Sequence, residues 1–90
     1  MNKGDLIQSI SERTGMSAEE IDRAVMTAFD VIAQQMAGGD SVSIHGFGTF
    51  SCRAVPAKRS RDAAGELMWK PARRVPHFRP GASLTSRFAG

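Results

Sequence analysis

The chain has 90 residues, of which 41% are hydrophobic and 23% charged, as expected for one small globular domain and not for a wholly disordered chain. Its net charge of +3 is unevenly distributed: residues 53–79 contain eight basic and two acidic residues, and the remainder contains four basic and seven acidic residues. A single cysteine excludes an intrachain disulfide, and no apolar run approaches the roughly 18 residues of a membrane span.

The first predicted helix spans residues 3–14, and Gly15 follows it as a C-terminal cap. Its apolar residues recur at helical spacing: Leu6, Ile7 and Ile10.

The second predicted helix begins at Ser17, where Ser17-Ala-Glu-Glu20 has the pattern of a capping box, and ends at Gly38-Gly39. Its apolar stripe recurs every three or four residues: Ile21, Val25, Phe29, Ile32 and Met36. Because the stripe is broad and a following sheet covers only one side of it, a second copy of the chain is expected to cover the rest.

Residues 41–52 predict a β-hairpin. Its half-buried strand positions alternate with polar ones: Val42, Ile44, Phe50 and Cys52. At the corner, Gly46 and Gly48 are expected to take positive φ, and Phe47 between them is expected to point back at the core.

A basic ribbon is predicted beyond the hairpin. Residues 53–61 and 66–76 form its two strands and residues 62–65 its turn, while Pro56 and Pro71 cannot donate to a strand ladder. Nine residues of strand reach roughly 30 Å, and an isolated ribbon is only marginally stable. We therefore expect an arm that is mobile until it lies on a partner. The arm also carries two large apolar side chains, Met68 and Trp69. They either pack against the other arm strand or the body of the protein, or they contact a ligand.

The chain ends with a core anchor, Phe78, and a short helix predicted from about residue 81, with Leu84 and Phe88 facing inward. Enzyme chemistry has little support, because His45 and His77 are the only histidines and Cys52 is the only thiol, too few for a Cys-His metal site. No cofactor or metal is expected. The basic arm instead indicates a polyanion, since guanidinium groups along a ribbon can follow a phosphate backbone or enter a narrow minor groove.

Several motifs together resemble the HU and integration host factor family of bacterial DNA-bending proteins. They are GFGTF at residues 46–50, an arginine at 61 near the arm turn, VPxFRxG at residues 75–81 and the opening MNK. The resemblance covers essentially all 90 residues. It implies an α+β, intertwined homodimer with an α-helical base, a three-stranded antiparallel sheet per chain and protruding β-ribbon arms. Residues 1–39 would form the helical dimerisation part, 40–80 the sheet and DNA-binding arm, and 81–90 the C-terminal helix.

The resemblance also implies a function: non-enzymatic, largely sequence-independent binding of double-stranded DNA through the minor groove. The role would be architectural, in the bacterial cytoplasm and nucleoid. A heterodimer with a paralogue stays open as an alternative to the homodimer. The expected DNA-binding residues are Lys3, Arg53, Lys58, Arg59, Arg61, Lys70, Arg73, Arg74 and Arg79. The expected dimer core is Phe29, Ile32, Phe47, Phe50 and Phe78.

The arm tip departs from the family pattern. The family typically has Arg-Asn-Pro there, with the proline wedged between base pairs, whereas this chain has Arg61-Asp62-Ala63 in a turn one residue shorter. Sharp bending is therefore in doubt. Two alternatives stay open: DNA coating or bridging with little bending, and a protein-interaction dimer that uses the basic arms on an acidic partner.

Overall fold

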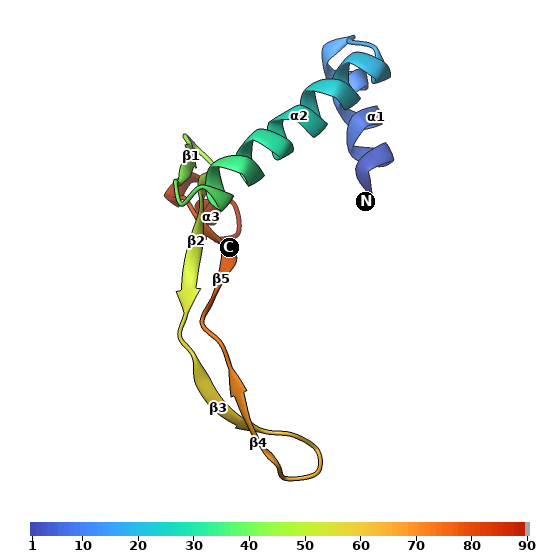
Figure 1. Ribbon diagram of the computed structural model, residues 1–90. Helices are drawn as coiled ribbons and strands as arrows, with labels where there is room; N and C mark the ends of the chain where they lie inside the picture. Colours follow the sequence, from blue (N-terminus) through green and yellow to red (C-terminus); the bar gives the residue numbers. More distant parts are fainter. Residues whose placement is uncertain (90) are drawn as a thin grey trace. The chain divides into compact units, whose positions relative to one another are not determined.

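The computed structural model describes residues 1–89 as two compact units, Met1–Gln34 and the chain from Gln35 onward (Figure 1). The elements follow one another as α1 (Lys3–Thr14), α2 (Ala18–Ala37), β1 (Val42–Ile44), β2 (Gly48–Val55), β3 (Lys58–Arg61), β4 (Leu67–Lys70), β5 (Arg73–Pro80) and α3 (Ala82–Ser86). This mixture of helices and antiparallel strands confirms the predicted α+β class. None of the helices within residues 1–89 is both long and apolar enough to cross a membrane.

The ends of α1 are fixed by two local motifs. Gly15 caps its C-terminus in the left-handed conformation, with φ of 76°, as the sequence predicts. At its N-terminus, the Asp5 amide donates to Asn2 Oδ1 at 3.0 Å and the Asn2 amide donates to Asp5 Oδ2 at 3.2 Å. This reciprocal capping box was not predicted from the sequence, although both residue types favour the first turn of a helix.

Helix α2 begins one residue after Ser17, whose Oγ accepts a hydrogen bond from the Glu20 amide at 3.2 Å. One of the two bonds of the predicted capping box is therefore present. The helix ends at Ala37, and Gly39 follows with φ of 92°, which confirms the predicted stop. In the first unit, Ile7 of α1 and Ile21 of α2 are the hydrophobic side chains that become buried, at 7% and 1% exposure.

Strands β1, β2 and β5 form an antiparallel sheet in the order β1-β2-β5. Phe50 pairs with Val42 on one side and with Phe78 on the other. The Phe47 ring joins these two phenylalanines, with its centroid 6.5 Å from that of Phe50 and 5.4 Å from that of Phe78. Phe47 is predicted to point back at the core; it does turn to the phenylalanines of the sheet, but 44% of the residue stays exposed in the single chain.

The two corner glycines have different roles. Gly46 takes the predicted positive φ, 81°. The same prediction for Gly48 is wrong, because Gly48 does not have positive φ but lies where neighbouring atoms leave no room for a side chain. A Cβ at Gly48 would lie 2.5 Å from the Arg79 carbonyl oxygen and 2.7 Å from the Phe78 ring. Close approach of the backbone therefore requires this glycine.

The ribbon continues beyond the sheet as a second antiparallel pair, β3 and β4 (Figure 1). Pairing of β2 with β5 ends at Val55 and Arg73, and pairing of β3 with β4 begins at Lys58 and Lys70. Pro56 lies in one intervening dipeptide and Pro71 in the other. Since proline has no amide hydrogen, the two prolines explain why the ladder is interrupted at the same level on both strands.

The C-terminal helix is confirmed, but it is shorter than the sequence indicated. Leu84 lies in α3 and is half-buried. Helix α3 ends at Ser86, and Phe88 beyond it is 81% exposed, so the expectation that Phe88 faces inward is wrong for the single chain.

Candidate nucleic-acid interface

The sheet part of the ribbon gathers arginines on one face. Residues directly opposite each other in an antiparallel pair project to the same face, and neighbours along a strand alternate. Arg53 is opposite Val75, Arg73 is opposite Val55, and Arg79 is opposite Thr49. The register therefore places Arg53, Arg73 and Arg79 on one face of the β2–β5 pair.

Arg74 lies on the other face, with Cys52 of the neighbouring strand. Its Nη2 donates to the Ala37 carbonyl at 2.8 Å, and Cys52 Sγ donates to the Met36 carbonyl at 2.9 Å. Both bonds satisfy carbonyl groups at the C-terminal end of α2, where a cation is also favoured by the helix dipole. The structure thus separates Arg74 from the other arginines of β5 and gives it a contact with the helix end; its part in DNA binding stays a prediction.

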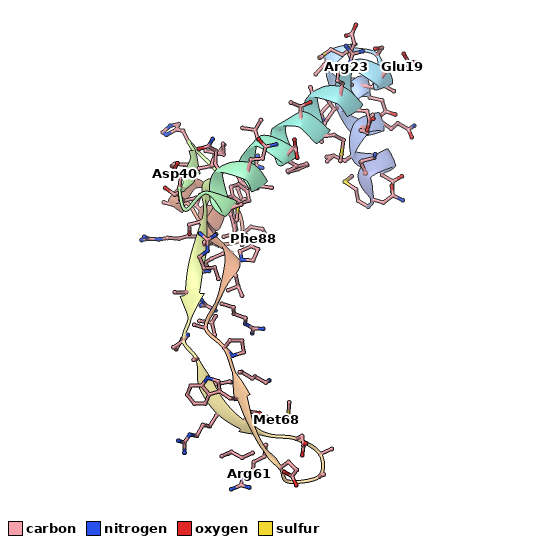
Figure 2. The ribbon with its side chains drawn as sticks, viewed as in Figure 1. Glu19, Arg23, Asp40, Arg61, Met68 and Phe88 are labelled. Atoms are coloured by element: carbon pink, nitrogen blue, oxygen red, sulfur yellow. The ribbon has the colours of Figure 1, made fainter. Side chains whose placement is uncertain are left out.

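The β3–β4 segment has two different faces. One face carries Arg59 opposite Trp69 and Arg61 opposite Leu67. The other carries Lys58 opposite Lys70 and Ser60 opposite Met68. The register therefore arranges the expected arm cations as an arginine face, which also carries apolar residues, and a lysine face. Figure 2 labels Arg61 of the first face and Met68 of the second.

Like charges meet at the base of this segment. Directly opposed lysines destabilise a strand pair, so Lys58 and Lys70 favour an anion between or beside them. An open hollow of about 250 Å³ lies here, and its lining includes three cationic and no acidic residues. The lining residues are Val55, Pro56, Lys58, Lys70, Pro71 and Arg73.

The tip turn is organised around Asp62. Its Oδ1 accepts hydrogen bonds from the amides of Ala64 and Glu66, both at 2.9 Å. Arg61 Nη1 donates to the Gly65 carbonyl at 2.9 Å, and Gly65 takes φ of 83°. Asp62, expected to place negative charge at the tip, therefore also serves as the internal acceptor that closes the turn.

Lys3 belongs to the first unit and forms an ion pair there. Its Nζ lies 3.2 Å from Asp22 Oδ1, and the two side chains are 56% and 46% exposed. Such an exposed pair contributes little to stability. The part of Lys3 in DNA binding stays a prediction.

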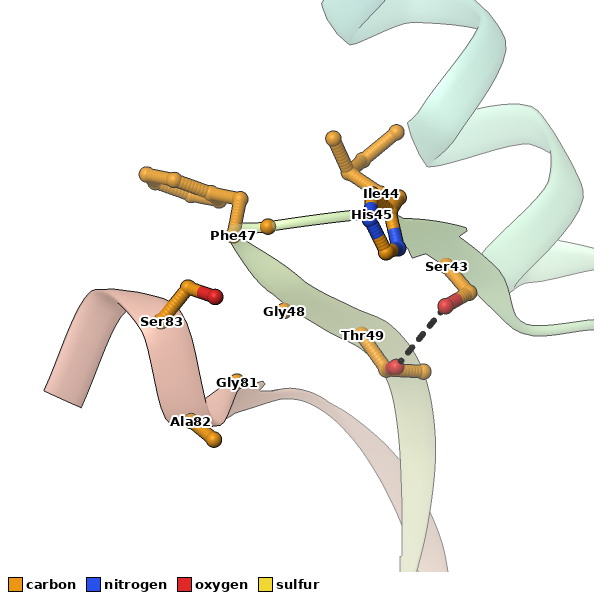
Figure 3. Close-up of a pocket in the computed structure, with 10 residues that line it drawn as sticks. Ser43, Ile44, His45, Phe47, Gly48, Thr49, Gly81, Ala82 and Ser83 are labelled. Carbon is orange, nitrogen blue, oxygen red and sulfur yellow. Dashed lines mark hydrogen bonds between the residues drawn. The ribbon is translucent and has the colours of Figure 1, made fainter. Parts of the chain in front are cut away.

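The hairpin corner contains a second hollow, of about 270 Å³, beside the start of α3 (Figure 3). Its walls come from residues 43–49 and 81–83, and His45 is the one titratable side chain among them. Thr49 Oγ1 donates to Ser43 Oγ at 3.4 Å between the paired strands β1 and β2. Because its lining has no lysine or arginine, this hollow lies outside the candidate interface. Within residues 1–89, no three His, Cys, Asp or Glu side chains come together as a possible metal site.

The sequence pattern alone does not identify every residue on the arginine-bearing faces. It does not assign Leu67 to the candidate interface and gives Trp69 two interpretations; both are exposed and share a face with arginines. On the sheet segment, Ser51 and His77 are opposite each other on the face of Arg53 and Arg79. The alternation along each strand indicates which of its residues share a face. Residues of two strands can be assigned to the same face only once the cross-strand register is known.

A three-stranded sheet that extends into a basic ribbon, in a chain that opens with two helices, defines a class of nucleic-acid-binding protein. The chain belongs to the bacterial DNA-binding protein family, whose model matches residues 1–89. It is 40% identical over 85 residues to DNA-binding protein HU of Geobacillus stearothermophilus, covering 93% of this chain and 94% of that protein. It is 36% identical over 89 residues to integration host factor subunit beta of Methylococcus capsulatus, covering 97% of this chain and 94% of that protein.

A solved relative agrees over nearly the whole fold. The Anabaena HU–DNA cocrystal structure superposes with a TM-score of 0.94 at 32% sequence identity, covering 99% of this chain and 98% of that chain. The family resemblance seen in the sequence is thereby confirmed.

Proposed function

We propose that this chain is a non-enzymatic architectural protein of the bacterial nucleoid that binds double-stranded DNA as a dimer. Its arms would contact the minor groove with little dependence on sequence. Membership of the family and the DNA bound to the Anabaena relative support the choice of DNA. The observation that carries the proposal is the strand register, which places exposed cations in both segments of one ribbon.

The chemistry of the ribbon suits a phosphate backbone. Between residues 53 and 79 the eight basic and two acidic residues give a net charge of +6. One of those acids, Asp62, already accepts two backbone amides. Contacts to phosphates and groove shape carry little base information, so the binding is expected to tolerate most sequences.

A dimer is supported by the apolar surface of the single chain. Within residues 1–89, Ile7 and Ile21 are the only hydrophobic residues that are buried, and only Ile21 is fully so. Of the expected dimer-core residues, Phe29 is 54% and Phe47 is 44% exposed, and the other three are half-buried: Ile32, Phe50 and Phe78. A chain of this size with so small a core gains most by covering these side chains with a second copy.

A second candidate is coating or bridging of DNA with little bending. Ala63 stands where relatives are expected to carry a proline wedge, and a methyl group buries too little surface to replace lost base stacking. Both candidates share the same DNA-binding arms and differ in the shape of the bound duplex.

Titration of a fluorescent duplex of arbitrary sequence at several salt concentrations tests the proposal. If each arm of a dimer meets about three phosphates, the slope of log K against log[salt] is expected to be near −5. Arg61→Ala should flatten the slope and weaken binding to all sequences about equally. Arg23→Ala, in the first unit and outside the basic arm, is the matched control and should leave the slope unchanged.

A slope close to zero would contradict binding by counterion release and would favour the alternative of an acidic protein partner.

A further inference from the structure

The arginine face of the β3–β4 segment is also its most apolar face. Trp69 is 64% exposed and Leu67 is 60% exposed, and the register sets them opposite Arg59 and Arg61. The lysine face carries one large apolar residue, Met68, at 46% exposure. Contact with phosphates alone would need no indole on the arm, so the exposed Trp69 requires its own explanation.

Two features of this face match a nucleobase with its flanking phosphates. The indole ring offers a flat aromatic surface, on which any base can stack. The opposed Arg59 and the nearby Arg61 supply cations for the phosphates on either side. The same arginines disfavour self-association through this face, because two copies would bring like charges together.

We propose that Trp69, assisted by Leu67, is the residue by which this arm contacts bases, and that it stacks on a base whose face is exposed. Such faces occur at an opened or interrupted step of a duplex and along a single strand. This inference rests on the proposed function. It assigns base contact to Trp69 on β4, which two residue pairs separate from the turn. The wedge position implied by the family resemblance is instead at the tip, where this chain has Ala63.

The chain offers a direct probe, because Trp69 is its only tryptophan and it has no tyrosine. Tryptophan emission would be recorded while the full chain is titrated with a continuous duplex, the same duplex with a short single-stranded gap, and the single strand alone. Stacking on a base quenches indole emission and protects it from acrylamide. We expect strong quenching with the gapped duplex, the single strand or both, and weak quenching with the continuous duplex.

Anisotropy of labelled DNA gives the matching affinities. Trp69→Ala should weaken binding to the ligand that quenches by roughly 5- to 150-fold, the range for loss of one aromatic–base stack. It should weaken binding to the continuous duplex much less than binding to the ligand that quenches. Trp69→Phe should restore most of the lost affinity. Met68→Ala, on the opposite face, is the matched control and should not discriminate between the ligands.

Several results would overturn the inference. One is unchanged emission on a gapped duplex that anisotropy shows to be bound, with Trp69→Ala binding like the natural chain. Another is equal quenching and equal loss of affinity on the continuous duplex, which would remove the need for an exposed base. A third is a concentration-dependent blue shift without DNA, which would assign the face to a second copy of the chain. Failure to bind any of the three ligands would instead overturn the proposed function itself.

Discussion

Asp62 combines a structural and an electrostatic effect that one pair of substitutions can separate. Asp62→Asn keeps an oxygen for the Ala64 and Glu66 amides and removes the negative charge. We expect it to bind every duplex more tightly by about 1.5- to 5-fold, the range for one exposed charge interaction. Fluorescent duplex titration measures this change. Asp62→Ala also removes the charge but loses both amide bonds; equal gains in the two variants would show that the closed turn has no part in binding.

Gly48 gives a prediction about stability. Gly48→Ala would place a Cβ 2.5 Å from the Arg79 carbonyl oxygen, and the backbone would have to move. We expect a loss of about 1–3 kcal/mol or more in the free energy of unfolding, measured by urea denaturation. Gly4→Ala is the control, because its Cβ would approach no atom closer than 3.4 Å and alanine favours the helix. A Gly48→Ala chain as stable as the natural one would contradict the close-approach argument.

At the scale of the element, we expect the arm tip to decide how far a bound duplex bends. Opening a base step costs a few kcal/mol and needs a sizeable apolar group in return. Ala63 is the second residue of the Asp62–Gly65 turn, which is closed by a 3.0 Å bond from the Gly65 amide to the Asp62 carbonyl. Proline is favoured at this position of a turn, so Ala63→Pro should fit without disturbing the arm.

We therefore expect the natural chain to shorten the end-to-end distance of a short duplex only slightly, and Ala63→Pro to shorten it more. Energy transfer between dyes at the duplex ends measures the distance. Ala64→Pro is the control, since it removes the amide that donates to Asp62 and should not increase bending. The idea fails if the natural chain already bends DNA sharply and Ala63→Pro leaves the bend unchanged.

At the scale of the whole molecule, stability should depend on association. We expect sedimentation to find a dimer at micromolar concentration. Phe47→Ala should destabilise it by roughly 3–5 kcal/mol, because Phe47 packs against Phe50 and Phe78 and its exposed part would be covered by a second copy. Leu67→Ala, at an exposed arm position, is the control and should leave the unfolding midpoint unchanged. A folded, stable monomer at that concentration would contradict the dimer.

The sequence by itself determined the local features and the class. Apolar spacing and Gly15 predicted α1, the Ser17 signal and the glycine pair bounded α2, and alternation predicted the strands. These features depend on neighbours a few residues apart, so they can be read without a fold. The uneven charge and the motifs around GFGTF and VPxFRxG also indicated the partner and the family.

Only the tertiary structure decided which side chains share a face. Arg73 and Arg74 are neighbours in sequence, yet one lies with Arg53 and the other binds the Ala37 carbonyl at the end of α2. Gly48 needs its missing side chain because the Arg79 carbonyl and the Phe78 ring approach it from a strand far along the chain. In the same way, Trp69 lies opposite Arg59 only through the register in which β3 and β4 pair. A one-residue shift of register would move every side chain of a strand to the other face, and nothing local in either strand fixes it.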